Sequence, residues 1–318
     1  MTDPFATKFS FTPANRLCIG VEEEVWTVRR ESGLLTPLAP HIFKDGHEKA
    51  YPFFKPELPS QQIEAVTPVC RSMKEVELAL RANAFDMERL AKKYDVGLSR
   101  DPIPTKPYSV SVFPSPRFLD LQNRFGKRLS GAYVAGLHVH IGLADREEAI
   151  LAMNVLRQHL PTFLALSASS PYFYHDTKYA SFRHFKYKQM AGAVAPPHLI
   201  SWREFTIAAQ HGGFYHDPRM CWWGVRINPL GTVELRVCDV QNSYNRTLSL
   251  VALTRMLVRA AIDRQVKPSM ISSASIEDRL MMSARGIWAS TDTESIVAML
   301  VSNRLYKEEA PYVKRLFP

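Results

Sequence analysis

The segment Gly20-Val21-Glu22-Glu23-Glu24-Val25 decides the fold, because it sets three consecutive carboxylates among strand-forming apolar residues. Side chains two apart in a strand point to the same face, so Glu22 and Glu24 share one face and Glu23 takes the other. A solvated strand edge is the plain structural explanation. The flanking core residues weaken it, since a charge removed from water needs a partner or a metal ion. We interpret the segment as a strand that presents carboxylates to a cleft.

Two further segments repeat this one-faced arrangement. One sets His138 and His140 two residues apart between glycines, and the other sets Glu234 and Arg236 two apart among valines and a leucine. A lone strand histidine is usually a core residue, and the Glu234–Arg236 pair has a simple ion pair as its structural alternative. Together the three segments line up carboxylates, imidazoles and a guanidinium on one β-surface. This pattern favours divalent cations and a phosphate, and therefore an enzyme.

The donor types indicate which cation to expect. Mg²⁺ takes oxygen ligands from carboxylates together with substrate phosphates, and Glu57 and Glu64 add acidic candidates around a second predicted strand. Zinc is an alternative because two histidines share a face. The other donors are carboxylates, however, and an oxygen-rich set with one imidazole favours Mg²⁺ or Mn²⁺.

Arginines supply the anion-binding candidates. Arg236 and Arg226 stand on the two strands of a predicted hairpin, and guanidinium suits bidentate contact with phosphate or carboxylate. Arg183 and Lys186 lie in the densest basic stretch, residues 178–188, where aromatic residues are interleaved. A solvated loop is the structural alternative for that stretch; a nucleic-acid surface is less favoured than a funnel for an anionic nucleotide. The chain has no P-loop and no G-x-G-x-x-G, so Walker and Rossmann sites lose support.

The bulk composition is that of a globular protein. The 318 residues carry a net charge of +9 and are 46% hydrophobic. We expect one catalytic domain over residues 1–318, with a helical tail from about residue 265. The four cysteines form no C-x-x-C pair and are expected to be reduced core thiols. No apolar run approaches the roughly 18 residues of a membrane span, and residues 1–11 lack a signal-peptide core, so we expect a cytoplasmic protein without membrane partners.

Periodicity and caps predict an α+β fold, an antiparallel sheet with helices packed on its outer face. Ser72, Asp145 and Ser201 are the predicted N-caps, with Glu75 in a capping box after Ser72. The proline-rich stretch 102–116 is a candidate functional loop. We predict strands at 15–28, 60–70, 96–100 and 133–143, and a hairpin at 222–228 and 231–239. We predict helices at 72–94, from 145 to about 161 or on to 169, at 202–210 and 243–264, two more after 265, and an irregular region at 170–200.

These residues together resemble a known family. The chain is similar to the carboxylate–amine ligases of the glutamate–cysteine ligase type 2 family, in particular its bacterial YbdK-like branch. The pieces that carry the resemblance occur in order between about residues 17 and 290: 20–24, 63–70, 136–142, 164–171, 180–183, 217–219, 222–226 and 231–239.

The resemblance implies a glutamine synthetase-like core, a funnel formed by a curved antiparallel sheet with helices outside. It implies ATP-dependent amide formation, in which a carboxylate, glutamate in the best-known members, is phosphorylated and an amine displaces the phosphate. Small-molecule acid and amine substrates follow, and relatives suggest a homodimer. By position, the metal ligands would be Glu22, Glu24, Glu57, Glu64, His138 and Glu234. Arg236, Arg226 and Arg183 would be catalytic and would bind ATP together with Lys186.

Two departures from the family pattern concern substrate choice. Arg100-Asp101-Pro102 stands where family members show Thr-His-Pro, so an acid replaces a histidine near the expected substrate mouth. Glu277-Asp278-Arg279-Leu280 lacks the tryptophan of a related element. The chain also ends short of the family's usual C-terminal helices.

Two alternative functions are compatible with the sequence. The same fold supports a phosphotransferase of the guanidino-kinase type, which stops at phosphorylation. A non-catalytic regulatory or binding protein would keep the basic surface, but it has no need to hold costly carboxylates together.

Overall fold

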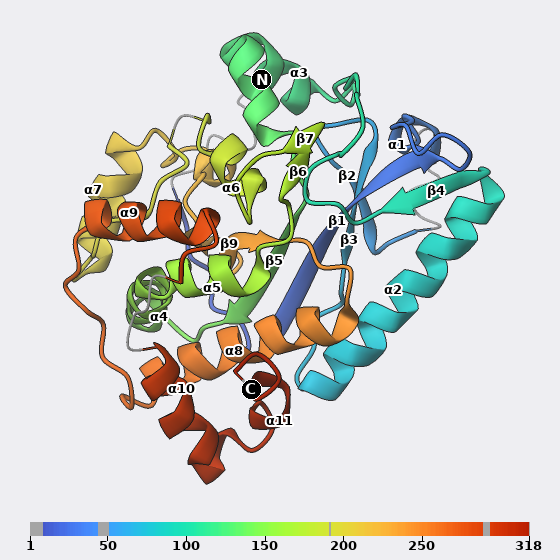
Figure 1. Ribbon diagram of the computed structural model, residues 1–318. Coiled ribbons are helices and arrows are strands. Elements are labelled where there is room, and N and C mark those ends of the chain that lie inside the picture. Colours follow the sequence, from blue (N-terminus) through green and yellow to red (C-terminus); the bar gives the residue numbers. More distant parts are fainter. Residues whose placement is uncertain (1–8, 44–50, 191, 289–292, 318) are drawn as a thin grey trace.

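The computed structural model describes residues 9–43, 51–190, 192–288 and 293–317 (Figure 1). Its centre is a seven-stranded sheet with the order β2-β3-β1-β5-β9-β8, in which β4 also pairs with β1. All its strand pairs are antiparallel, which confirms the predicted fold class. The strands are β1 (Ile19–Arg29), β2 (Phe54–Pro56), β3 (Gln62–Val66), β4 (Val96–Ser99), β5 (Gly136–Gly142), β8 (Val225–Asn228) and β9 (Thr232–Asp239).

Helices cover one face of this sheet (Figure 1). Helices α4, α5 and α8 pack on β5, β8 and β9, while α2 runs beside β1 and β4. The helices are α1 (Ala39–Ile42), α2 (Met73–Lys93), α3 (Pro116–Phe125), α4 (Arg146–Gln158), α5 (Leu160–Ser167), α6 (Phe182–Tyr187), α7 (Trp202–His211), α8 (Tyr244–Ile262), α9 (Ser273–Ala284), α10 (Thr293–Ser302) and α11 (Ala310–Val313). Short 3₁₀ turns are η2 (Gly126–Ala132), η3 (Pro218–Met220) and η4 (Arg304–Tyr306), and a small hairpin is formed by β6 (Tyr172–Phe173) and β7 (His175–Asp176).

The predicted helix starts are confirmed by their caps. Ser72, Asp145 and Ser201 each accept a hydrogen bond from the backbone N–H three residues further on. The Glu75 side chain also turns back, but it accepts from the backbone N–H of Arg71 at 2.8 Å, one residue before the cap. These local hydrogen bonds explain why α2, α4 and α7 begin where the sequence pattern places them.

Other boundaries differ from the predictions. The predicted helix from residue 145 divides into α4 and α5, because Pro161 stands in the first turn of α5 and cannot donate a helix hydrogen bond. Strand β2 and helices α3 and α6 were not predicted, and β2 and α6 are too short for a periodic signal. The tail contains α9, α10 and α11 where two helices were expected.

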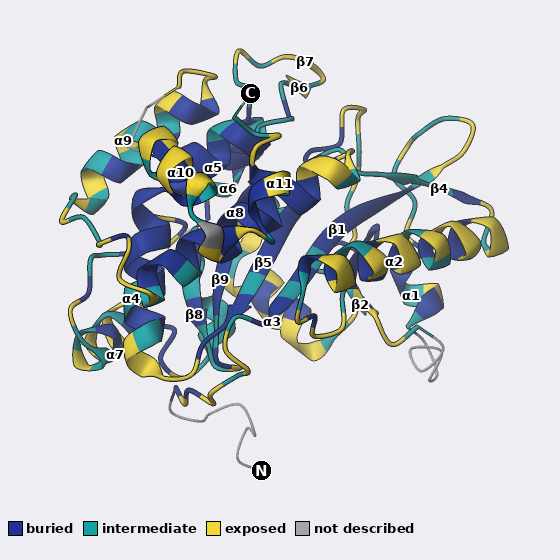
Figure 2. Cartoon of the chain, turned by 90° about the horizontal axis from the view of Figure 1, so that it is seen from below, coloured by how far each residue is buried: buried dark blue, intermediate teal, exposed yellow. Residues whose placement is uncertain are grey.

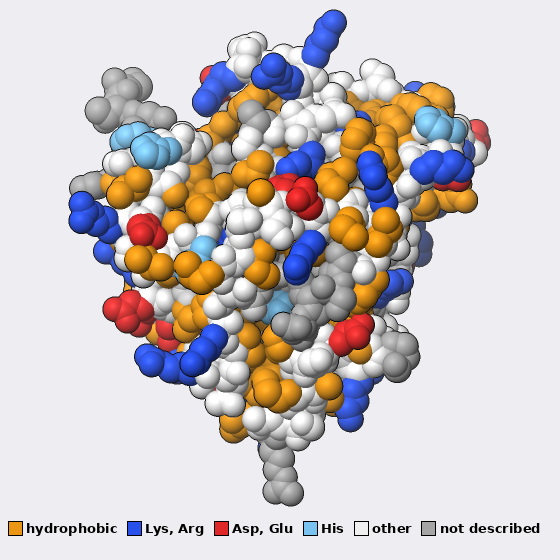
Figure 3. All heavy atoms as spheres, turned by 60° about the vertical axis from the view of Figure 1, so that its left-hand side comes forward, with side chains coloured by type: hydrophobic (Ala, Val, Ile, Leu, Met, Phe, Trp, Pro, Cys, Tyr) orange, Lys and Arg blue, Asp and Glu red, His pale blue; other side chains and the backbone are white. Residues whose placement is uncertain are grey.

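Burial separates the layers clearly. Helix α8 is buried along most of its length, whereas α2 exposes its outer face (Figure 2). On the face drawn in Figure 3, Lys and Arg side chains are dispersed among hydrophobic and neutral atoms, as their spread in the sequence predicts. Among the described residues, no helix has both the length and the apolar character that crossing a membrane requires. The four cysteines, Cys18, Cys70, Cys221 and Cys238, are free and buried, as predicted.

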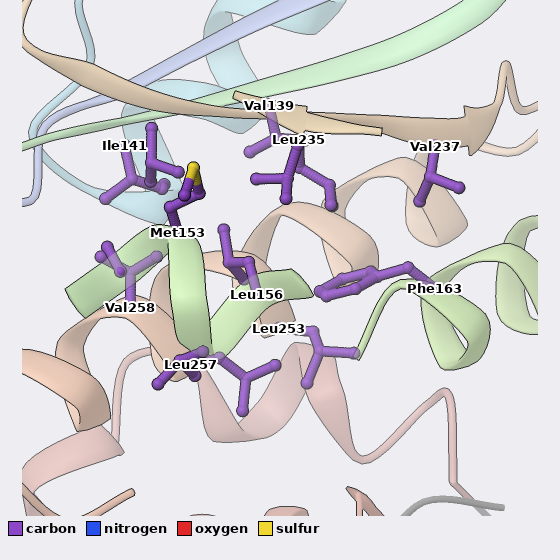
Figure 4. Packing of buried hydrophobic residues seen from close by; sticks show 14 of the residues in the cluster. Val139, Ile141, Met153, Leu156, Phe163, Leu235, Val237, Leu253, Leu257 and Val258 are labelled. Carbon is purple, nitrogen blue, oxygen red and sulfur yellow. The ribbon is translucent and has the colours of Figure 1, made fainter. Parts of the chain in front are cut away.

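The main core lies between the sheet and the helices (Figure 4). Alternate residues of β5 and β9 point toward α4, α5 and α8, where they meet the apolar faces of those helices. The labelled core residues are Val139, Ile141, Leu235 and Val237 from the strands, and Met153, Leu156, Phe163, Leu253, Leu257 and Val258 from the helices. Because this face is apolar, the charged residues of the same strands are left for the other face.

Glu23 is a charged residue on the helix side of β1. Its carboxylate is 2.8 Å from the guanidinium of Arg100, and the hydroxyl of Thr247 donates to it at 3.3 Å. The middle glutamate of the triplet therefore points away from Glu22 and Glu24, as the alternation in a strand predicts.

Candidate active site

The face of the sheet away from the helices forms the wall of a cavity of about 270 Å³. Carboxylates line one side of it and guanidinium groups the other. The charged lining residues are Glu22, Glu24, Lys55, Glu57, Glu64, Arg117, His138, Arg183, Arg219, Arg226 and Arg236. Eight of the ten predicted site residues line this cavity, and Glu234 lies directly beneath Arg226 and Arg236.

Strand register brings these side chains together. Neighbouring strands place Glu22 opposite His138, Glu24 opposite Glu64, and Glu234 opposite both His140 and Arg226. Directly opposed residues have adjacent side chains on the same face. The pairing between β5 and β9 shifts between Leu137 and Val139, a bulge that re-aims side chains beside His138.

The first group of metal-ligand candidates is Glu22, His138 and Glu234, whose ligand atoms lie within 4.8 Å of one another. Burial acts to raise the pKa of Glu22, but hydrogen bonds from His138 and His140 outweigh it and hold that pKa far below its usual value. Burial, with the charge of Arg236, lowers the pKa of His138 to about 4. His138 is therefore neutral at pH 7, the form that binds a metal ion.

Glu234 is already saturated by hydrogen-bond donors. Arg226 donates through Nε at 2.8 Å and Nη2 at 3.1 Å, Asn228 donates at 3.0 Å, and Arg236 donates through Nη1. Burial opposes ionisation, but the two arginines outweigh it and hold the pKa of Glu234 well below its usual value. A carboxylate offers about four acceptor positions, so a metal ion at Glu234 would replace one of these donors.

The second group contains Glu24, Glu64 and His138, again within 4.8 Å, with Glu57 beside it. Burial raises the pKa of Glu24 to about 7, and burial with the charge of Glu24 does the same for Glu57. Burial and the charges of Glu22 and Glu57 raise the pKa of Glu64 well above its usual value. These buried carboxylates fit a divalent cation, because a bound ion would offset the repulsion between neighbouring carboxylates that contributes to their raised pKa values.

His140 supports the carboxylates rather than completing a ligand group. Its Nδ1 is 3.0 Å from the hydroxyl of Thr232, and its Nε2 lies 3.5 Å from Glu22 and 3.9 Å from Glu234. His138, in contrast, belongs to both groups of ligand candidates.

Arg183 reaches the cavity from α6 across Gly136. Its guanidinium donates to the backbone carbonyls of Val237 at 3.2 Å and Arg236 at 3.3 Å. A Cβ atom at Gly136 would collide with that guanidinium, so glycine at this position makes room for it. Arg183 is thus fixed by backbone contacts while one side still lines the cavity.

The structure does not bring Lys186 into this cavity, contrary to the prediction. Its ammonium donates to the hydroxyl of Tyr108 and lies 5.2 Å from the ring of Tyr108 and 5.0 Å from that of Phe173. Burial lowers the pKa of Lys186 to about 8. Lys186 therefore ties α6 to the 102–116 loop instead of facing the carboxylates.

Asp101 also lies elsewhere than expected. Its carboxylate accepts from the hydroxyl of Ser99 at 2.8 Å, and its carbonyl accepts from the indole of Trp26 at 2.9 Å. The cavity wall does not include it. Glu277, from the second departing segment, accepts from Lys188 and from the backbone of Ala195.

Sequence reasoning missed two cavity cations. Lys55 stands in β2, which ends at Pro56, so the strand is too short to give a periodic signal that would pair Lys55 with Glu57. Arg117 stands near the start of α3, and the residues around it in the sequence form no motif that indicates a site. Arg219, which the family resemblance includes without a role, is held by Asp217 through hydrogen bonds of 2.7 and 3.1 Å.

A second cavity of about 540 Å³ adjoins the first. Glu22 and Lys55 line both cavities. Apart from these two and His140, the second is lined by neutral residues: Pro13, Ala14, Asn15, Cys18, Ile19, Gly20, Val21, Val66, Thr67, Val69, Leu230 and Thr232.

Residues 18–284 match the family model of glutamate-cysteine ligase family 2. The chain belongs to this family. A protein of Saccharopolyspora erythraea provisionally named glutamate–cysteine ligase 2-2 is 35% identical over 272 residues, covering 79% of this chain and 69% of its own. A protein of Rubrobacter xylanophilus provisionally named glutamate–cysteine ligase 2-3 is 34% identical over 263 residues, covering 80% and 72%.

Solved structures of other ligases share the fold. A bifunctional glutathione synthetase from Pasteurella multocida superimposes with a TM-score of 0.65 at 14% identity, over 95% of this chain and 46% of that chain. A glutamate–cysteine ligase from Francisella tularensis, solved in complex with AMP, gives 0.63 at 12% identity, over 97% and 82%. These likenesses confirm the predicted fold, an antiparallel sheet with helices packed on its outer face.

Proposed function

We propose that this member of glutamate-cysteine ligase family 2 is an ATP-dependent carboxylate–amine ligase that forms a γ-glutamyl-type amide. One observation carries the proposal: the cavity sets crowded carboxylates opposite fixed guanidinium groups on one sheet face. Phosphoryl transfer needs this combination, because it depends on positioning and on neutralising charge around the transferred group.

The reaction would take two steps. An oxygen of the acid substrate attacks the γ-phosphorus of ATP, the bond to the β-phosphate oxygen breaks, and ADP leaves with that electron pair. The nitrogen of the amine then attacks the acyl carbon, the carbon–oxygen bond to phosphate breaks, and the amine loses a proton. The deep cavity position of the carboxylates and arginines would keep the activated acid away from water.

The residues present fit Mg²⁺ or Mn²⁺. Such an ion, when bound, would neutralise charge on the phosphate oxygens. Glu24, Glu57, Glu64 and His138 would hold it on the crowded side, and Glu22 and Glu234 would serve a neighbouring position.

The arginines would bind the anionic groups. Arg226 and Arg236 are oriented by Glu234 and Arg183 by backbone carbonyls, so their geometry is set before a ligand arrives. The neutral second cavity suits the nucleoside of ATP, since it offers apolar surface with a few polar groups beside the charged site.

The substrate acid is proposed to be glutamate or a related amino acid. Arg117 and Arg219 add two cations to the wall of the first cavity, where they would receive a second carboxylate. The names of the family and its relatives support glutamate as the acid.

The proposal is tested by measuring ADP formation from ATP and Mg²⁺ over a panel of acids and amines. Turnover that needs both an acid and an amine, with a product mass equal to their sum less one water, would support it. A stable phosphorylated product that forms without an amine would point to a phosphotransferase instead. Absence of nucleotide binding together with absence of turnover for every pair would refute the ligase assignment.

A further inference from the structure

Lys55 connects the two groups of metal-ligand candidates. Its ammonium lies 3.8 Å from the carboxylate of Glu22 and 3.4 Å from that of Glu64. Glu22 belongs to the first group and Glu64 to the second. Of the Lys and Arg side chains that line the two cavities in the described part of the chain, only Lys55 lines both. It therefore stands where the phosphates of a nucleotide would pass from the second cavity into the first.

The contacts of Lys55 differ from those of the cavity arginines. Arg226 and Arg236 are locked by Glu234, and their side chains are 14% exposed, whereas the Lys55 side chain is 53% exposed. The lysine stem has four rotatable carbons, so the ammonium can change partners without moving the strand. Two carboxylates within 4 Å of the ammonium favour its charged form.

We propose that Lys55 is an exchanging cation: without metal it neutralises Glu22 and Glu64, and with metal and nucleotide bound it turns to the terminal phosphates of ATP. This inference rests on the proposed ligase function and adds a phosphate-binding residue to it. The described arginines of the site are less suited to exchange between carboxylates and phosphates. Arg226 and Arg236 are held by Glu234, Arg219 by Asp217 and Arg183 by backbone carbonyls. Arg117 lines the first cavity but not the second.

Elementary electrostatics drives the exchange. A divalent cation at Glu64 satisfies the carboxylates and repels an ammonium a few ångströms away. The phosphates of the nucleotide offer that ammonium a new set of anionic acceptors at the same place. Cross-strand pairing of Lys55 with Glu64 keeps the lysine Cα beside the carboxylates in both states, so only the side chain moves.

The proposal predicts opposite effects on two ligands. In Lys55→Met, Mn²⁺ without nucleotide should bind about 5- to 10-fold more tightly, because a competing internal cation is gone. ATP with saturating Mg²⁺ should bind about 10-fold more weakly, because one charge-assisted phosphate contact is lost. AMP, which lacks the terminal phosphates, should bind as in the wild type. Lys55→Arg should keep most of the ATP affinity.

The experiment is calorimetric titration of the whole chain with Mn²⁺, ATP and AMP. Lys74→Met is the matched control, since Lys74 is an exposed lysine paired with one glutamate on α2 and lines neither cavity. Circular dichroism melts show that each variant is folded before titration.

The outcomes separate the two levels of inference. If wild-type protein binds no nucleotide, the ligase proposal fails. If the wild type binds ATP and Lys55→Met binds both ATP and Mn²⁺ equally well, only the role of Lys55 fails. Parallel weakening of Mn²⁺, ATP and AMP would show that Lys55 is a structural ion-pair partner and would overturn its exchange.

Discussion

Glu234 and Glu24 are buried glutamates on the same face of one sheet, yet the pKa of the first is held well below its usual value and that of the second is raised to about 7. Two arginines and an asparagine donate hydrogen bonds to Glu234. Glu24 accepts only from the backbone N–H of Gly136 among the described residues, and burial raises its pKa against the opposing charges of Arg183 and Arg236. The half built around β8 and β9 carries its own countercharge. In the half built around β1 and β3, one cation, Lys55, contacts Glu22 and Glu64, so carboxylates remain in excess and favour a cationic ligand.

The difference shows how one sheet can serve two kinds of ligand. A carboxylate that orients arginines becomes part of an anion-binding wall, while carboxylates that repel one another form a cation-binding wall. Replacing a glutamate by glutamine should therefore lower the free energy of unfolding in the half around β8 and β9 and raise it, without metal, in the half around β1 and β3.

The largest expected effect is on the saturated half. Glu234→Gln leaves Arg226 and Arg236 without their carboxylate, and breaking a buried pair in this way costs about 3–5 kcal/mol. Urea unfolding in the presence of EDTA would measure the loss. An unfolding free energy equal to that of the wild type would show that Glu234 does not stabilise the fold by neutralising Arg226 and Arg236.

The next effect is a pH-dependent stability in the crowded half. The folded state raises the pKa of Glu24 from 4.5 to about 7, so it holds the proton more tightly than the unfolded chain. This contribution is present below about pH 4.5 and is lost as pH rises through about 7, by up to about 3 kcal/mol.

Glu24→Gln isolates that contribution from those of other titrating groups. With EDTA at pH 8 the variant should be more stable than the wild type, at pH 5 the two should converge, and Mg²⁺ should narrow the gap at pH 8. A difference in unfolding free energy that is the same at both pH values would contradict the raised pKa.

Glu64→Gln should abolish metal binding. In the absence of metal, the variant should have a higher free energy of unfolding than the wild type, because burial and the charges of Glu22 and Glu57 disfavour an ionised Glu64. We expect at least about a 100-fold loss of ADP formation, the scale associated with losing one electrostatic element of a catalytic site. Mn²⁺ titration and the ADP assay measure the two effects. Retained Mn²⁺ affinity would move the cation site away from β3.

Gly136→Ala should displace the Arg183 guanidinium and lower ADP formation about 10-fold, because small shifts of a positioning group are costly. Gly224→Ala is the matched control, since Gly224 lines neither cavity. A Cβ atom there would meet Leu160 at an ordinary 3.4 Å, so activity should stay near the wild-type level. Equal rates for the two variants would remove Arg183 from the anion-binding wall.

The smallest effect is expected outside the cavity. Lys186→Met should leave ADP formation within about 2-fold and change stability at pH 7 by less than about 1 kcal/mol, because an apolar chain suits the aromatic pocket. Burial lowers the pKa of Lys186 from 10.5 to about 8, so the unfolded chain holds this proton more tightly than the folded chain. The contribution of Lys186 to the stability of the wild type should therefore be constant below about pH 7 and should become more favourable as pH rises from about 8 to 10.5. A 10-fold loss of activity would return Lys186 to the site.

Much of the fold and site follows from period and spacing. The rule that pairs strand residues two apart is enough to group Glu22, Glu24, His138, Glu234 and Arg236 from the sequence alone. Cap residues place the starts of three long helices. These signals are local, so the linear sequence carries them in full.

The failures are non-local. Lys186 sits three residues from Arg183 on one short helix, and only the approach of Tyr108 and Phe173 from other segments decides that it turns aside. Strand β2 has three residues, which is too few for a period, so Lys55 went unnoticed. The pKa values of Glu24 and Glu234 are shifted in opposite directions because strand register gives the two carboxylates different neighbours. Spacing along the chain does not specify these neighbours.

The Glu23–Arg100 contact has a consequence for how the sheet assembles. A slip of β1 by one residue would turn Glu23 into the cavity and press Glu22 and Glu24 into the apolar layer under α8, stranding charges at several kcal/mol each. Misaligned pairings are thus penalised by the groups that give the cavity its chemistry. Replacing any one of the three glutamates by an apolar residue should therefore lower the energetic penalty that separates the native register of β1 from its neighbours.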